Sequence, residues 1–146
     1  MAEPEYVSLE EVERVCEELG ISNWAAQPPE TVSAKEAAVI LKAMAVEGMD
    51  IPVETMRVGL EVELEHGTMF ADANVTNNHP ILTGKIVLAH LKETMDYYDR
   101  LDVAEIEGDL LKAAVAGKAE KLQQLYRKLV AARGQLAQAE ADALAS

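Results

Sequence analysis

The sequence is short of cysteine, aromatic residues and basic residues. It has one Cys, one Trp, one Phe and four Tyr among 146 residues, whereas Ala, Leu, Val and Glu are abundant. The single cysteine, Cys16, excludes an intrachain disulfide and fits a small core residue in a reducing compartment. So few aromatic side chains favour helices packed through aliphatic residues over a β-sandwich. We therefore predict an all-α fold, a compact bundle of about five to six helices with a long amphipathic C-terminal helix.

The charge is strongly negative and unevenly distributed. The formal net charge is −13, and residues 1–66 carry 15 acidic and 4 basic side chains, against 11 and 9 in the remainder. Binding to nucleic acid through phosphates requires Lys and Arg, so we predict no nucleic-acid partner and, for the same reason, no anionic membrane surface. The acidic first half is more typical of a solvated surface than of a cation site.

The opening residues give an expectation about location. The stretch "MAEPEYVSLEE" is acidic and lacks an apolar run, which argues against a signal or transit peptide. No stretch approaches the length needed to cross a bilayer. We expect a cytoplasmic protein, or one incorporated into a virion that is assembled there.

Two capping signals predict the first two helices. Ser8 with Glu11, and Ser33 with Glu36, each place an N-cap hydroxyl three residues before a carboxylate. A glycine follows each apolar run and is a favoured helix stop. The predicted helices are residues 9–19, ending at Gly20, and residues 34–47, ending at Gly48.

The stretch "GLEVELEHG", residues 59–67, alternates apolar and acidic residues and fits a strand over its own length. Over a longer window the apolar positions step by three and four residues, which is the period of a helix. We predict a helix in which Asp50 caps, Pro52 lies in the first turn and Gly67 is the stop. The choice matters because Glu63 and His66 share a face only in a helix.

A fourth helix is predicted from Pro80 to Glu93, and Asp96 is a candidate cap for the next one. Beyond Gly108 the chain predicts one or two helices. The predicted segments are residues 1–50, a helical pair; residues 51–107, a central domain; and residues 108–146, a coiled-coil-like C-terminal helix, together forming one globular unit.

The C-terminal segment carries an apolar seam that needs a partner. Its positions follow a three-four spacing typical of a coiled coil: Leu122, Leu125, Leu129, Ala132, Leu136, Ala139 and Ala143. The partner is either the other helices of this domain or another chain, which includes a second copy of this one. The candidate partner-binding residues are Leu122, Leu125, Leu129 and Leu136.

Two motifs place a carboxylate and an imidazole one helical turn apart, Glu63-x-x-His66 and His90-x-x-Glu93. Helical bundles use this spacing to bind metals, so these four residues are candidate ligands for Fe, Mn or Zn, with Glu61 as a further carboxylate. The second pair is reversed relative to a ferritin-like site. The alternative, which we weight more heavily, is structural: the groups cap helix ends or bond to the Asn-rich loop.

Other catalytic motifs are missing. Gly84 and Lys85 lie in a "TGK" stretch that is too short for a phosphate-binding loop, so we interpret them as a close helix contact and a surface cation. Cys16 has no neighbouring basic residue, and no serine lies in a G-x-S-x-G turn. Whether the chain is an enzyme stays open.

Residues 56–102 contain four segments in the order "EVELEHG", "NVTNN", "TGKIVLAHL" and "DYYDRL". These segments resemble a small domain-of-unknown-function family of bacterial and bacteriophage proteins, whose members carry "EVELEHG", "NVTND", "TGKIALAHL" and "DYYTRL" in the same order. His79 stands where the family tends to carry an acidic residue, which weakens a ligand role for the loop. The family has no established activity. The resemblance implies that these residues occupy motif positions: Glu63, Glu65, His66, Asn74, Thr76, Asn77, Thr83, Lys85, His90, Asp96, Tyr97 and Tyr98.

Two functions follow as hypotheses. The first is a non-enzymatic helical structural or interaction protein, phage-encoded and associated with a virion or its assembly, whose C-terminal helix binds a protein partner or a second copy. The second is a metal-binding protein, either an oxidoreductase or a hydrolase, that uses Glu63, His66, His90 and Glu93.

Overall fold

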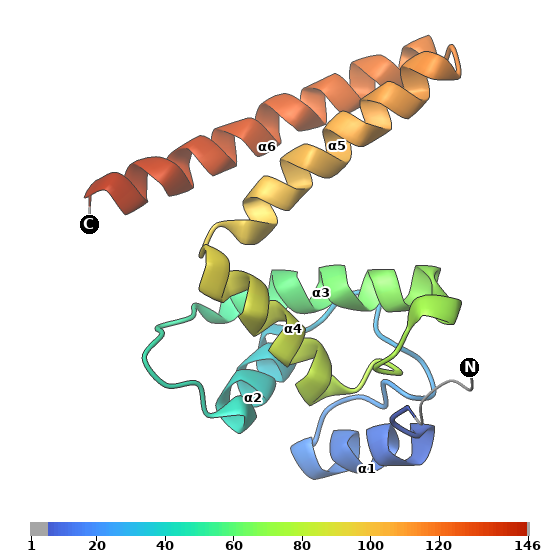
Figure 1. The fold of residues 1–146 in the computed structure, drawn as a ribbon, viewed down its shortest axis with the longest axis vertical. Helices are drawn as coiled ribbons and strands as arrows, with labels where there is room; N and C mark the ends of the chain where they lie inside the picture. The colour runs from blue at the N-terminus through green and yellow to red at the C-terminus, as the bar shows by residue number, and fades with distance from the viewer. Residues whose placement is uncertain (1–5, 146) are drawn as a thin grey trace, which may run out of the picture. The chain divides into compact units, whose positions relative to one another are not determined.

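The computed structural model describes residues 6–145, and this part of the chain is all-helical, as predicted (Figure 1). It contains six α-helices and one short 3-10 helix. None of the described helices is long and apolar enough to cross a membrane. The elements are α1 (Leu9–Leu19), α2 (Ala34–Met44), α3 (Val53–Met69), η1 (Ala71–Ala73), α4 (Pro80–Glu93), α5 (Tyr97–Val115) and α6 (Ala119–Ala145).

The chain divides into two units, one ending at His90 and the other beginning at Leu91. The buried aliphatic side chains of the first unit come from α1 to α4, and Trp24, in the loop after α1, is also fully buried. A buried indole of this size contributes a large apolar area to the core. The other buried hydrophobic residues of this unit include Val12, Val15, Cys16, Val32, Ala37, Ile40, Ile51, Met56, Leu60, Leu64 and Val87.

The first two helices begin as predicted. Ser8 accepts a hydrogen bond of 3.2 Å from the Glu11 amide, and α1 ends at Gly20, which has a φ of 65°. At α2 the full capping box of Ser33 and Glu36 forms. The predicted end of α2 at residue 47 is wrong, because Ala45 already adopts the left-handed conformation and its amide bonds to the Lys42 carbonyl.

The alternating stretch forms a helix, which settles the choice between strand and helix. Asp50 does not cap α3; Pro52 occupies the N-cap position and there is no side-chain capping hydrogen bond. The predicted stop at Gly67 is also wrong, since the helix continues to Met69. Gly67 is needed for a close contact, described below, and not for termination.

Helices α5 and α6 form an antiparallel hairpin whose turn contains Gly117, with a φ of 68° (Figure 1). Helix α5 runs through Gly108, across the segment boundary predicted at residue 107. Ion pairs of 2.9 Å from Arg100 to Glu140 and 2.8 Å from Arg133 to Glu107 link the two helices. The hairpin core consists of Ile106, Ala113, Leu125, Leu129 and Ala132, with Val103, Leu110 and Leu122 packed against it.

Candidate functional site

The candidate metal ligands are partly brought together. The Glu63 carboxylate lies between two imidazoles, 3.5 Å from His90 Nε2 and 3.9 Å from His66 Nδ1. Its side chain is 12% exposed, whereas those of His66 and His90 are 45% and 29% exposed. The helix α3 places His66 one turn after Glu63, and α4 brings His90 to the same carboxylate. The result is a His–Glu–His cluster at the surface of the first unit.

The other two predicted carboxylates, Glu93 and Glu61, are not part of this cluster. Glu93 is exposed at the end of α4, in the second unit. Glu61 accepts a hydrogen bond of 2.9 Å from the Val32 amide and pairs with Arg57, which also binds Glu54. Within residues 6–145, no group of three or more His, Cys, Asp or Glu side chains is arranged to hold a metal ion.

The Asn-rich loop between α3 and α4 is held by its own side chains. Asn74 Nδ2 donates to the Gly67 carbonyl at 3.1 Å and to Asn78 Oδ1 at 2.9 Å, while the Thr76 hydroxyl donates to Asn74 Oδ1 at 3.2 Å. A Cβ on Gly67 would lie 2.6 Å from Asn78 Oδ1, closer than side-chain contacts allow. The motif residues Asn74 and Thr76 therefore join the end of α3 to the loop.

The same loop connects to the N-terminal segment and starts α4. Asn77 Nδ2 donates a hydrogen bond of 2.6 Å to the Val7 carbonyl, and Asn77 and Asn78 both have positive φ angles, which asparagine tolerates better than most residues. His79 is buried, and its Nδ1 accepts from the Ile81 amide at 3.2 Å. Burial lowers the pKa of His79, which favours the neutral imidazole that this bond requires.

His79 thus serves as the N-cap acceptor of α4. An acidic residue supplies the same kind of acceptor at many helix starts, and here the imidazole supplies it. Further along α4, Gly84 lies against Met44 and Ile40, where a Cβ would approach Met44 Sδ to 2.7 Å. Lys85 is exposed. Both observations agree with the predicted close contact and surface cation.

The tyrosine motif begins α5. Tyr97 and Tyr98 contact edge to face, with ring centroids 5.2 Å apart, and Tyr98 is buried. Asp96 occupies the N-cap position, but its carboxylate accepts no capping hydrogen bond from a backbone amide of the first turn. It binds Arg100 at 2.7 Å and the Thr94 hydroxyl, and these bonds lower its pKa, the Arg100 bond most. This motif organises a helix start.

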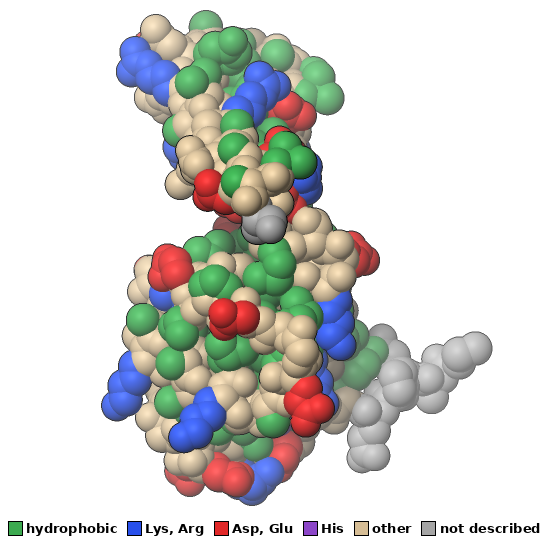
Figure 2. Space-filling view, turned by 90° about the vertical axis from the view of Figure 1, so that its left-hand side faces the viewer, with side chains coloured by type: hydrophobic (Ala, Val, Ile, Leu, Met, Phe, Trp, Pro, Cys, Tyr) green, Lys and Arg blue, Asp and Glu red, His purple; other side chains and the backbone are tan. Residues whose placement is uncertain are grey.

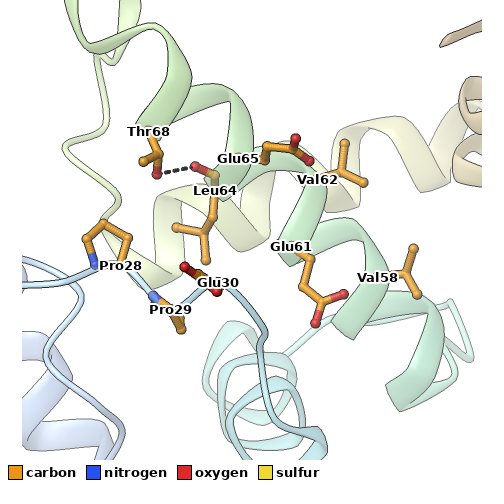
Figure 3. A pocket seen from close by; sticks show the side chains of 9 residues that line it. All are labelled: Pro28, Pro29, Glu30, Val58, Glu61, Val62, Leu64, Glu65 and Thr68. Carbon is orange, nitrogen blue, oxygen red and sulfur yellow. Dashed lines mark hydrogen bonds between the residues drawn. The ribbon is translucent and has the colours of Figure 1, made fainter. Parts of the chain in front are cut away.

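A groove that the sequence analysis missed lies between the loop after α1 and one face of α3 (Figure 3). Its volume is about 500 Å³. Figure 3 shows Pro28, Pro29 and Glu30 on the loop across from the side chains of α3. We call it the α3 groove, and its lining residues are Pro28, Pro29, Glu30, Val58, Glu61, Val62, Leu64, Glu65 and Thr68.

The α3 groove combines apolar walls with carboxylates. Proline, valine and leucine side chains form most of its lining, and three glutamates lie among them. Glu61 is engaged by Arg57 and the Val32 amide, but Glu30 and Glu65 are exposed and form no ion pair within residues 6–145. Such a groove suits a ligand that carries positive charge beside apolar groups. The part of the groove that can be recognised in the sequence is the "QPPE" loop, but no periodic pattern links this loop with α3.

The predicted C-terminal seam finds its partner inside the chain. Leu125 and Leu129 are buried against α5, Leu122 packs partly against the same core, and Leu136 is half-buried. This is the first of the two predicted alternatives for the seam. The first three leucines hold the hairpin together, so an outside partner would have to bind another face of α6.

Such a face exists on both helices of the hairpin. On α6, Tyr126, Val130 and Leu144 are 59%, 57% and 90% exposed, and on α5 Leu111 and Val115 are 67% and 82% exposed. Spacings of four and fourteen residues place the three α6 residues on one side of the helix, next to the buried seam. We call these five residues the outer stripes. A concave surface of about 640 Å³ lies among Leu110, Ala119, Leu122, Gln123, Tyr126 and Arg127.

These features define an all-α protein with two helical units and no recognised catalytic constellation in the described residues. The chain belongs to the family described as Protein of unknown function (DUF5661), which matches residues 12–107, more than half of its length. The match covers the whole stretch on which the resemblance was based and confirms it. No curated protein and no solved structure matches the chain.

Proposed function

We propose that this protein is a non-enzymatic helical interaction protein that self-associates through its C-terminal hairpin. The observation that carries the proposal is the exposure of the outer stripes. Their side chains are more than half exposed, including those of Leu111, Val115, Tyr126 and Val130. Single exposed apolar residues are ordinary, but several on neighbouring turns of two packed helices are typical of a protein-binding surface. The hairpin core is complete without them, so they are free to contact another molecule.

The outer stripes lie on a hairpin whose two helices are fixed against each other. Leu125 and Leu129 fix α6 against α5, and the Arg100–Glu140 and Arg133–Glu107 pairs join the helices on the surface. A preformed surface loses little conformational entropy when it binds. Tyrosine is enriched at such interfaces because its ring offers a large contact area with few rotatable bonds.

The test is sedimentation of the full chain over a wide concentration range, with the double variant Tyr126→Ser, Val130→Ser. We expect the wild type to associate and the variant to associate at least about tenfold more weakly, a loss of about 1.4 kcal/mol or more. Serine has a helix propensity close to those of tyrosine and valine, so α6 should persist. Equal association of both proteins would overturn the proposal.

A matched control removes apolar surface elsewhere. Met69 and Val75 are 61% and 55% exposed in the first unit, close to the values for Tyr126 and Val130. The variant Met69→Ser, Val75→Ser should associate like the wild type. Point substitutions are preferable to removing the chain after Gly117, because that truncation would also expose Ile106 and Ala113 of α5.

We also propose that the assembled protein belongs to a bacteriophage particle or to its assembly. The support is the resemblance of residues 56–102 to bacterial and bacteriophage proteins, together with a fold suited to protein contacts. Mass spectrometry of purified particles tests this idea. The chain should be present in amounts comparable to known particle proteins, and its absence would contradict the proposal.

Metal binding is the second candidate. The observation that favours it is the Glu63 carboxylate between His90 Nε2 at 3.5 Å and His66 Nδ1 at 3.9 Å. Carboxylate and imidazole are suitable ligands for Fe, Mn or Zn, and the partly exposed imidazoles would leave positions for water or substrate. Glu93 is not in this cluster, so a metal bound there would need another group in the place predicted for Glu93. Metal analysis of variants that lack His66 and His90 tests this candidate.

A further inference from the structure

The turn of the hairpin and the first part of α6 form a basic region on an acidic protein. Residues 118–133 contain five basic side chains and one acidic one, although the whole chain has a net charge of −13. Lys118, Lys121, Arg127 and Lys128 are exposed and form no ion pair within the described residues. Figure 2 shows basic side chains beside hydrophobic ones on the hairpin surface. We call residues 116–128 the hairpin tip.

The tip is apolar as well as basic. Tyr126 is 59% exposed, and it lines the concave surface of about 640 Å³ together with Leu122 and Arg127. Lysine and arginine keep their charges in water while their aliphatic stems cover apolar surface. The tip therefore presents the two properties that the α3 groove would recognise, an apolar body and several unpaired cations.

The α3 groove has the complementary character. Its walls include Pro28, Pro29 and Val62, and its free carboxylates are Glu30 and Glu65. Residues up to His66 have a charge balance of −11, from 15 acidic and 4 basic side chains, so the field around the groove attracts cations. Unpaired charges of opposite sign on two apolar surfaces are the usual basis of electrostatic complementarity between partners.

We propose that the hairpin tip of one copy docks into the α3 groove of a second copy. This inference rests on the proposed self-association and names the surface that receives the hairpin. Tyr126 packs against the proline and valine side chains of the groove, while Arg127 and Lys118 approach Glu30 and Glu65. Association of two identical tips is disfavoured, because it would bring unpaired cations together.

This contact joins two different surfaces, so it is heterologous. Each copy still has a free tip or a free groove after one contact forms, and the assembly grows until a ring closes or continues as a filament. A symmetric dimer is therefore not the expected end point. The association should weaken in about 1 M salt, where the screening length falls to about 3 Å.

The test uses charge reversal in the full chain, followed by sedimentation velocity. The groove variant is Glu30→Lys, Glu65→Lys, and the tip variant is Lys118→Glu, Arg127→Glu. All four side chains are exposed and without an ion pair in residues 6–145, so the fold should be kept, which circular dichroism and Trp24 fluorescence check. Two control variants make the same changes in charge at exposed positions outside both surfaces. The control for the groove variant is Glu17→Lys, Glu47→Lys, and the control for the tip variant is Lys42→Glu, Lys85→Glu.

The proposal expects concentration-dependent association of the wild type and of both control variants. The groove variant and the tip variant alone should each associate at least about tenfold more weakly. Mixing them should restore association, because every contact again joins opposite charges. No restoration in the mixture, or a wild type that stays monomeric up to about 1 mM, would overturn the proposal.

One result separates this inference from the proposed function. Association could be lost in two proteins, the tip variant and the double variant Tyr126→Ser, Val130→Ser, but kept in the groove variant. In that case the hairpin binds a different surface. The proposed self-association would then stand, and docking into the α3 groove would be wrong. The groove would in that case be left to a basic segment of another protein.

Discussion

Asn74 donates a hydrogen bond of 3.1 Å to the carbonyl of Gly67, and the two residues approach so closely that a Cβ on Gly67 would lie 3.0 Å from Asn74 Nδ2. The Asn78 side chain is closer still, at 2.6 Å from that position. Gly67 lies inside α3, where glycine is intrinsically unfavourable. Its place there is explained by the loop that packs against it.

The substitution Gly67→Ala should therefore destabilise the protein, by about 1–3 kcal/mol, despite the better helix propensity of alanine. Gly108 is the matched control, because it lies inside α5 and has no atom within 4 Å of an added Cβ. Gly108→Ala should be neutral or stabilising by up to about 1 kcal/mol. Thermal unfolding followed by circular dichroism measures both, and a stabilising Gly67→Ala would contradict the described contact.

The His79 cap predicts a dependence of stability on pH. Burial lowers the pKa of His79 in the folded protein below its usual value of about 6.5. The folded state therefore binds this proton less readily than the unfolded state. The contribution of His79 is present above the unfolded pKa and is lost as the pH falls through the folded pKa. At neutral pH, His79→Ala should cost about 1 kcal/mol, as for other N-caps.

Urea unfolding monitored by Trp24 fluorescence, at about pH 8 and about pH 5.5, measures this effect. His79→Asn keeps a cap acceptor that does not titrate, so its stability should fall less between these pH values than that of the wild type. His66→Asn removes an exposed imidazole and serves as the control. Parallel pH profiles for the wild type and His79→Asn would exclude the titration of this cap.

Glu36 predicts a second pH effect in a more acidic range. Partial burial would raise its pKa, but hydrogen bonds from Ser22 and Ser33 outweigh it and lower the pKa to about 2. The carboxylate accepts from both hydroxyls and both amides, at distances of 2.6 to 3.2 Å. Its stabilising contribution is present above the unfolded pKa, about 4.5, and is lost as the pH falls towards 2.

The variant Glu36→Gln keeps one oxygen acceptor and should lose about 1–2 kcal/mol at neutral pH. The difference from the wild type should shrink as the pH is lowered below about 4.5, because the wild-type carboxyl then becomes protonated. Chemical unfolding at several pH values measures this difference. Glu47→Gln, at an exposed position outside the capping box, should show no comparable change.

Metal content separates the two candidate functions. The metal hypothesis expects stoichiometric Fe, Mn or Zn in protein purified without chelator or affinity metal, and its loss in His66→Ala, His90→Ala. The interaction proposal expects the same trace amounts in both proteins. Elemental mass spectrometry makes the measurement. Stoichiometric metal in the wild type alone would favour the His–Glu–His cluster and call for redox and hydrolytic assays.

Sequence reasoning was most successful where local chemistry determines structure. The bounds of α1 and α4 follow from Ser8, Gly20 and Pro80, each of which acts on its own neighbours. It failed at Gly67, because a glycine that ends a helix and a glycine that admits a neighbouring loop look alike in sequence. Only the contact with Asn74 and Asn78 distinguishes them.

The sites show the same division. The one-turn spacing of Glu63 and His66 was predictable, and so was the seam containing Leu125 and Leu129. The α3 groove was not, because it joins the loop at residues 28–30 to a helix face about thirty residues later, and nothing periodic connects the two. The outer stripes were not predicted either, because Tyr126 and Val130 lie beside the stronger three-four pattern of the seam on the same helix.

The short turn at Gly117 has a consequence for how the second unit folds. The core residues that pack against α6 in the hairpin lie on α5, immediately before it in the chain. Contacts between neighbouring segments require little loop closure, and helical hairpins of this kind fold within microseconds to milliseconds. We expect the hairpin to re-form much faster than the first unit, so a chain that has only begun to refold already presents the outer stripes.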